Sequence, residues 1–132
     1  MTKVSFGRDQ YGAPSFSADD AWSAYGAMLT GDVQTDRMWL LDLLAWIEDA
    51  RSGRLDSQTW QGNSWSVQIS AKGVSLDDVY SDDWSGSYSL DDAHQVAMDY
   101  LAFLEPTPEG RATAATGWRG RTGRDHPCAA HF

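Results

Sequence analysis

The stretch SLDDVYSDDWSG, residues 75–86, gathers four aspartates around a tyrosine and a tryptophan, with no positive charge among them. Tyrosine and tryptophan anchor protein interfaces because they bury much area with few rotatable bonds, and charges at the rim select the partner. The pattern therefore favours a recognition loop whose rings make contact and whose carboxylates attract lysines and arginines. The predicted partner-binding residues are Asp77, Asp78, Tyr80, Asp82, Asp83 and Trp84.

A structural role for the same stretch is about equally consistent with the sequence. In that interpretation Trp84 and Tyr88 fix the loop to the core, while the aspartates only face water. The sequence leaves these two alternatives open.

Paired acids also occur in calcium sites and in carboxylate catalysis, but the spacing here favours neither. A calcium loop has a glycine at its sixth position and a glutamate at its twelfth. Counting from Asp77, those positions hold Asp82 and Tyr88. A catalytic dyad needs two carboxylates whose environments give them different pKa values, one of them being desolvated. A run of acids in a loop, in contrast, is ordinarily solvated. We therefore expect these aspartates to be neither calcium ligands nor catalytic groups.

The histidines and the single cysteine do not form a recognisable ligand set. A zinc site takes three or four ligands at short spacing, and His94 has no histidine or cysteine three or four positions away. The segment HPCAAH places His126, Cys128 and His131 together, where they could hold a metal adventitiously. A catalytic cysteine, however, needs a rigid setting and an adjacent cation. We predict no metal, no cofactor and no enzymatic activity.

The chain carries ten lysines and arginines against nineteen aspartates and glutamates, a formal net charge of −9. This balance argues against direct nucleic-acid binding, because phosphate neutralisation requires lysine and arginine. It favours a basic protein partner, which an acidic surface attracts through long-range steering. The alternative is that the acidic surface only keeps the protein soluble.

The charge is unevenly distributed. Residues 1–105 hold six basic against seventeen acidic residues, a net of −11, whereas residues 106–132 hold four arginines against two acids, a net of +2. The second segment is also rich in glycine, proline, alanine and threonine and shows no apolar period. We predict a flexible tail over residues 106–132, with folding back onto the acidic body as the less favoured alternative.

Three features of the composition bear on location. The first residues, MTKVSFGRDQYG, contain no apolar signal region, and no stretch approaches the roughly eighteen apolar residues of a membrane span. A single cysteine excludes a disulfide framework within one chain and fits a reducing compartment. We expect a cytoplasmic protein that does not contact membranes, with residues 1–105 as its one domain.

Alternating apolar and polar residues predict several strands. Residues 3–7 and 13–17 read as an N-terminal hairpin, with Pro14 suggesting an edge position. Residues 57–61 and 64–70 follow the same period around a Gly-Asn turn, and residues 74–80 supply a third strand or half-strand. Together these stretches predict an antiparallel meander with one face exposed to solvent.

Periodic apolar residues predict two main helices. The first runs from a cap at Thr35 or Asp32 to Arg51. Its apolar residues cover much more of the helix surface than a single stripe. Such a helix lies between two layers or offers an exposed edge to a partner. The second helix begins at Ser89, with Asp92 at the third position, and ends before Pro106.

Residues 18–30 are ambiguous, with a short helix slightly favoured. The expected fold class is α+β, with an antiparallel sheet of four to five strands and two main helices packed on one face.

The order of these landmarks resembles the YacL-type family of small bacterial proteins. The resemblance rests on FGRDQYG (residues 6–12), LLDLL (40–44), WQGNSWSV (60–67) and QVAMDYLAFL (95–104), within residues 3–105. The family has no assigned enzymatic activity, and some of its relatives look like immunity proteins that neutralise toxins from neighbouring bacteria. The resemblance thus implies a binding protein and carries no catalytic residues. The arginine-rich segment after residue 105 departs from the family's compact length.

From the resemblance and the charge, we expect an immunity or antitoxin-type protein that binds a basic toxin domain, for example a nuclease. The alternative function is a non-enzymatic housekeeping module that binds another protein. An enzyme would instead require an apolar cleft holding a perturbed aspartate or His94.

Overall fold

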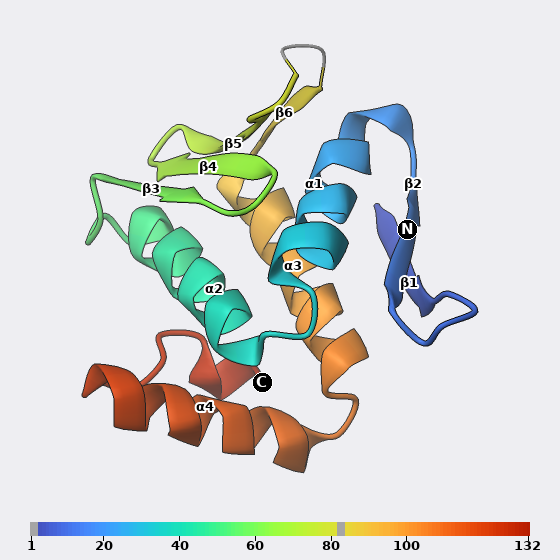
Figure 1. The fold of residues 1–132 in the computed structure, drawn as a ribbon. Helices are drawn as coiled ribbons and strands as arrows, with labels where there is room; N and C mark the ends of the chain where they lie inside the picture. Colours follow the sequence, from blue (N-terminus) through green and yellow to red (C-terminus); the bar gives the residue numbers. More distant parts are fainter. Residues whose placement is uncertain (1–2, 82–83) are drawn as a thin grey trace.

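The computed structural model describes residues 3–81 and 84–132, which fold into two antiparallel sheets and four α-helices (Figure 1). The α+β class is as predicted. In the larger sheet each strand pairs with the next one along the chain, in the order β3-β4-β5-β6. These strands are β3 (Ser57–Gln61), β4 (Trp65–Ser70), β5 (Gly73–Asp78) and β6 (Ser85–Tyr88).

The N-terminal hairpin forms a separate sheet from β1 (Val4–Arg8) and β2 (Pro14–Ala18), with Phe6 opposite Phe16. The prediction of a single sheet is wrong in this respect, although the larger sheet does have four strands. Strand β6 is not among the predicted strands, because only Tyr88 of its four residues is buried and no apolar alternation is visible.

The meander has the predicted two-faced character. In β4 the side chains of Trp65, Val67 and Ile69 are buried, whereas those of Ser66, Gln68 and Ser70 lie on the opposite face. Helices α2 (Arg37–Arg51) and α3 (Leu90–Leu104) pack against this sheet through contacts with β4 and β5.

Helix α3 begins as predicted, because the Ser89 hydroxyl oxygen accepts a hydrogen bond from the Asp92 N–H at 3.1 Å. Helix α2 begins one residue later than predicted, at Asp36, whose carboxylate accepts from the Trp39 N–H at 3.0 Å. Neither Thr35 nor Asp32 is the cap. The carboxylate of Asp32 instead accepts from the backbone N–H of Trp65 at 2.9 Å and so joins the helical layer to β4.

The ambiguous residues before α2 are mostly helical. They form α1 (Ser23–Met28) and one π-helical turn, Leu29–Val33. The buried Tyr25 of α1 donates its hydroxyl hydrogen to the Ala93 carbonyl of α3 at 2.8 Å, which fixes α1 against α3.

Helix α2 is apolar around most of its circumference because it packs between several elements. It contacts β4, lies side by side with α3 and is crossed by α4 (Pro108–Thr122) (Figure 1). Leu40, Leu43 and Leu44 are accordingly fully buried. Of the two predicted roles for this helix, a position between layers is the correct one.

The prediction of a flexible tail is wrong, because most of residues 106–132 is helix α4. The Thr107 hydroxyl caps its start by accepting from the Gly110 N–H at 3.1 Å, and Pro108 follows at the first turn. Gly123 ends the helix with a φ of 80°, which glycine adopts without strain. The sequence does not reveal this helix, because only Ala114 and Trp118 in it are buried, too few to show an apolar period.

Charge pairing holds this segment on the body of the protein. The Trp118 ring N–H donates to a carboxylate oxygen of Asp42 at 2.9 Å, and Arg121 pairs with the same carboxylate. Arg124 lies 2.6 Å from the carboxylate of Asp49. The less favoured alternative, in which the basic segment folds back onto the acidic body, is therefore what the structure has.

Across the described residues, none of the helices combines the length and the apolar character that crossing a membrane requires.

Candidate partner-binding surface

The predicted recognition loop lies at the end of the β5–β6 hairpin. Its base is well ordered by backbone hydrogen bonds: the Asp78 N–H donates to the Trp84 carbonyl at 3.0 Å, and the Val79 N–H donates to the Ser64 carbonyl at 2.9 Å. The Asp78 carboxylate also accepts from the Tyr80 N–H at 2.9 Å, an Asx-type turn. The hairpin end is thus held against the turn that precedes β4.

Apolar side chains are concentrated at this end of the hairpin. Tyr80 is 81% exposed, Trp84 is 42% exposed and Val79 is 38% exposed. Among the described residues only one other large apolar side chain, Tyr11, is comparably exposed. We call Asp77, Asp78, Val79, Tyr80 and Trp84 the hairpin-end surface. Exposed apolar groups gathered in this way mark interaction sites more often than single exposed ones do.

The structural alternative is partly correct for the two aromatic residues that it named. Tyr88 is buried and packs against Trp22, with ring centroids 4.3 Å apart. Trp84 meets the buried Trp65 edge to face, at a centroid distance of 5.1 Å. Trp84 is therefore anchored on one side and open on the other, which is the arrangement of a preorganised contact residue.

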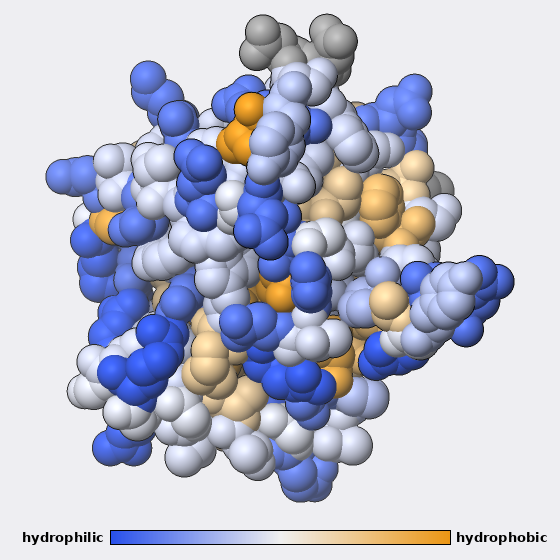
Figure 2. All heavy atoms as spheres, viewed as in Figure 1, coloured by the Kyte–Doolittle hydropathy of each residue, from blue (hydrophilic) through white to orange (hydrophobic). Residues whose placement is uncertain are grey.

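The charges of this surface have no cationic partner within the described part of the chain. No lysine or arginine there forms an ion pair with Asp77 or Asp78, whereas Asp42 and Asp49 are paired with arginines of the C-terminal segment. The predicted contact residues Asp82 and Asp83 lie outside the described residues. In Figure 1 strands β5 and β6 run toward the side of the molecule opposite α4, and Figure 2 shows the same view with all heavy atoms.

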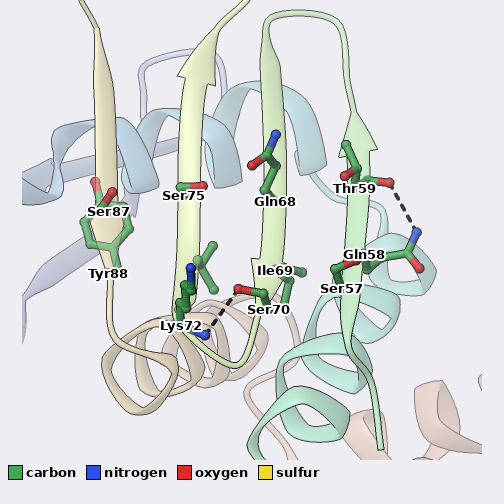
Figure 3. A pocket seen from close by; sticks show the side chains of 12 residues that line it. Ser57, Gln58, Thr59, Gln68, Ile69, Ser70, Lys72, Ser75, Ser87 and Tyr88 are labelled. Atoms are coloured by element: carbon green, nitrogen blue, oxygen red, sulfur yellow. Dashed lines mark hydrogen bonds between the residues drawn. The ribbon is translucent and has the colours of Figure 1, made fainter.

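The outer face of the larger sheet offers a second surface of different chemistry (Figure 3). Thr59, Gln68, Ser75 and Ser87 form one cross-strand row over all four strands. They line an open depression of about 420 Å³, and Lys72 is the only charged residue among its described lining residues. These hydroxyls and amides can form hydrogen bonds. The same described lining holds no histidine, cysteine, aspartate or glutamate.

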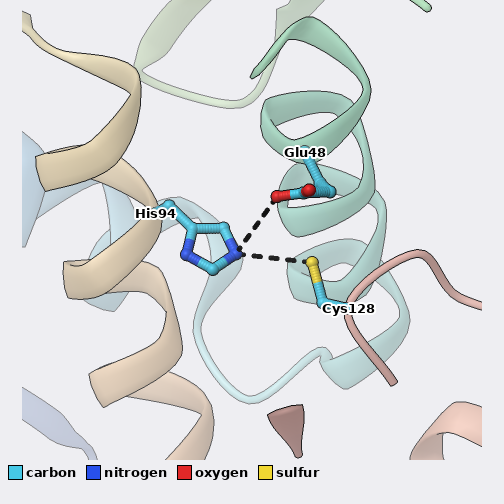
Figure 4. A group of neighbouring side chains, drawn as sticks. All are labelled: Glu48, His94 and Cys128. Carbon is cyan, nitrogen blue, oxygen red and sulfur yellow. Dashed lines mark hydrogen bonds and ion pairs between the residues drawn. The ribbon is translucent and has the colours of Figure 1, made fainter. Parts of the chain in front are cut away.

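A third group of side chains is partly buried between α2, α3 and the C-terminal segment, where sequence reasoning expected none. Glu48 of α2, His94 of α3 and Cys128 place their ligand atoms within 4.8 Å of one another (Figure 4). The His94 Nε2 atom lies 3.4 Å from the Cys128 sulfur and 3.9 Å from a Glu48 carboxylate oxygen. The sequence interpretation that His94 is isolated and that Cys128 lies in a flexible tail is wrong.

Burial determines the protonation of this group. Burial raises the pKa of the Cys128 thiol to about 12, because a thiolate is poorly solvated there. Burial also lowers the pKa of His94, and the nearby Arg51 cation acts in the same direction. At neutral pH the cluster therefore holds a neutral thiol and a neutral imidazole.

This arrangement differs from a catalytic cysteine relay. In such a relay the base contacts the nucleophile through one ring nitrogen and the acid through the other. Here the thiol and the carboxylate both face the Nε2 atom of His94. The sulfur is fully buried and protonated, so it is not an activated nucleophile.

Comparison of the chain with models of known protein families, with curated proteins and with solved structures finds no significant match. The resemblance to the YacL-type family therefore stays a prediction.

Proposed function

We propose that this protein is an immunity or antitoxin-type protein, which binds a cognate basic toxin domain, such as a nuclease, through the hairpin-end surface. The observation that supports the proposal most directly is the clustering of Val79, Tyr80 and Trp84, three exposed apolar side chains, beside acids that have no cationic partner among the described residues. This combination matches the anatomy of an interface with aromatic anchors and a charged rim.

The internal pairing of charges supports the choice of this surface. The C-terminal arginines neutralise acids on α2, as the pairs Arg121–Asp42 and Arg124–Asp49 show. Within the described residues, Asp77 and Asp78 do not share this neutralisation. A basic partner would therefore be steered toward the hairpin end, over a Debye length of about 8 Å at physiological salt.

The anchored aromatic ring of Trp84 supports slow release once the partner is bound. Its contact with Trp65 limits its freedom before binding, so little conformational entropy is lost when the exposed face of the ring is buried. Carboxylates at the rim mainly raise the association rate, and buried aromatic contacts mainly lower the dissociation rate.

A pull-down with the full chain as bait tests the proposal. The bait should recover a basic toxin domain encoded next to this protein, and the Asp77→Asn/Asp78→Asn variant should recover less of it. Asparagine keeps a side-chain acceptor for the turn at Tyr80 while it removes both charges. The Asp20→Asn/Asp56→Asn variant changes two exposed acids elsewhere and is the control, because it alters the net charge equally.

Equal loss of binding in both charge variants would show that net charge alone matters and would contradict the proposed surface. Recovery of a partner with no basic character, unaffected by either variant, would favour the alternative function of a housekeeping binding module.

A further inference from the structure

We infer that Glu48, His94 and Cys128 form a binding site for a divalent transition-metal ion of the zinc type, which ties the C-terminal segment to helices α2 and α3. This inference is independent of the proposed toxin-binding function. It begins from three different donor side chains, contributed by three separate parts of the chain, whose ligand atoms converge between α2, α3 and the C-terminal segment (Figure 4).

The donor types suit zinc. Sulfur from cysteine, nitrogen from histidine and oxygen from a carboxylate are the three kinds of protein ligand that zinc takes. On binding the ion, the Cys128 thiol gives up its proton to solvent and becomes a thiolate. The thiolate and the Glu48 carboxylate balance the two positive charges of the ion, and the neutral imidazole adds none. The complex is thus electrically neutral, which limits the cost of placing it among buried groups.

The spacing is also suitable. Tetrahedral zinc with ordinary bond lengths separates a nitrogen and a sulfur ligand by about 3.6 Å, and a nitrogen and an oxygen ligand by about 3.4 Å. The observed separations from His94 Nε2 are 3.4 Å to the sulfur and 3.9 Å to the carboxylate oxygen. The second separation must shorten by about 0.5 Å for tetrahedral geometry, and the Glu48 side chain, which is 28% exposed, would have to rotate to achieve this.

Convergence on one nitrogen is the feature that points to a metal. An ion bound by His94 Nε2 would lie between the sulfur and the carboxylate, which both face that atom. A catalytic relay would use both ring nitrogens. In the metal-free protein the sulfur and Nε2 are joined by a thiol–imidazole hydrogen bond, and an ion on Nε2 would take the place of the thiol proton. Three ligands also leave a fourth position, which a water can take on the side that Glu48 opens to solvent.

The surrounding hydrogen bonds hold the ligands in place. The Cys128 N–H donates to the His126 ring nitrogen Nδ1 at 3.0 Å, and the other His126 nitrogen lies 2.8 Å from the Leu41 carbonyl of α2. Arg51 lies 3.2 Å from a Glu48 oxygen. That oxygen, Oε2, is also the one that lies 3.9 Å from His94 Nε2, so the Glu48 carboxylate must turn to present one oxygen to the ion and the other to Arg51, which then acts as an outer-shell partner.

Titration of the reduced full chain with Co²⁺ tests the inference, because cobalt replaces zinc and reports its ligands by absorption. We expect one equivalent to bind, with a thiolate-to-cobalt charge-transfer band and the intense visible bands of tetrahedral coordination. Zinc should displace the cobalt and remove both bands. The Cys128→Ser variant should lose the charge-transfer band.

The Glu48→Gln and His94→Gln variants should bind Co²⁺ more weakly than wild type, by more than the roughly 10- to 100-fold that loss of an outer-shell partner costs. The Glu109→Gln variant, which removes an exposed carboxylate on α4, is the matched control and should bind like wild type. Circular dichroism establishes that each variant is folded. If Cys128→Ser does not fold, the Glu48→Gln variant still tests the site, because Glu48 is partly exposed.

Two results would overturn the inference. One is the absence of a charge-transfer band at one equivalent of cobalt. The other is undiminished binding in both Glu48→Gln and His94→Gln, which would place the metal adventitiously on the HPCAAH segment alone.

Discussion

Replacing Trp118 with alanine tests whether the C-terminal segment is part of the folded protein. Trp118 is 3% exposed, although it lies in a segment whose composition predicts a flexible tail. Its ring N–H bonds to Asp42, its ring packs against His126 at a centroid distance of 4.6 Å, and the Arg124 guanidinium lies 5.4 Å from its centre. One side chain thus joins α4, α2 and the residues after Gly123.

The magnitude follows from this burial. Removing a buried tryptophan costs about 3–5 kcal/mol, a large share of the roughly 5–15 kcal/mol that stabilises a domain. The Trp118→Phe variant keeps most of the packing but loses the bond to the charged Asp42 carboxylate, which corresponds to about 1.5–3 kcal/mol. We therefore expect the free energy of unfolding to fall in the order wild type, Trp118→Phe, Trp118→Ala.

Urea unfolding followed by circular dichroism measures these free energies. The Trp84→Ala variant is the control, because it removes a tryptophan that is 42% exposed and should cost only about 1–2 kcal/mol. A loss below about 0.5 kcal/mol for Trp118→Ala, the range of ordinary surface substitutions, would refute the packing of α4 on the body.

Two further predictions follow from local structure. Replacing Ser89, the cap of α3, with alanine should lower the free energy of unfolding by about 1 kcal/mol, and urea unfolding should show it; an unchanged midpoint would contradict the cap. Burial raises the pKa of Tyr100 from 10.0 to about 12. Because the folded state holds this proton more tightly, its contribution to stability is complete below pH 10 and is lost as the pH rises toward about 12. The Tyr100→Phe variant should lose less stability over this interval than wild type, and parallel pH profiles would contradict this.

Local patterns in the sequence predict much of the fold. Alternation in residues such as Trp65, Val67 and Ile69 identifies the inner face of β4. The Ser89 cap of α3 is likewise visible in the sequence, because its hydrogen bond spans only three positions. Both signals arise within a few residues, where the chemistry of neighbours determines the conformation.

The features that the sequence does not reveal depend on contacts between distant residues. Trp118 packs because it meets Asp42, 76 positions away, and no periodic pattern surrounds it. His94 and Cys128 are 34 positions apart and meet only because α4 returns the chain to α2. The division into two sheets likewise follows from which strands pair, which alternation along each strand does not determine.

The candidate surface is only partly predictable. The clustering of aromatic and acidic residues is evident in the sequence, but the exposure of each ring is not. Trp84 is anchored by Trp65 and Tyr80 is almost fully exposed, although both stand in the same predicted loop.

Photo-crosslinking from Tyr80 tests most directly whether the hairpin-end surface binds a basic protein. A photoreactive phenylalanine derivative at position 80 is compared with the same group at Tyr11, which is 86% exposed against 81% for Tyr80 but lies on the β1–β2 hairpin. We predict that irradiation in cells links position 80, and not position 11, to a basic protein, and that Asp77→Asn/Asp78→Asn reduces this product. Crosslinks of equal yield from both positions, or a product from position 11 alone, would contradict the proposed surface.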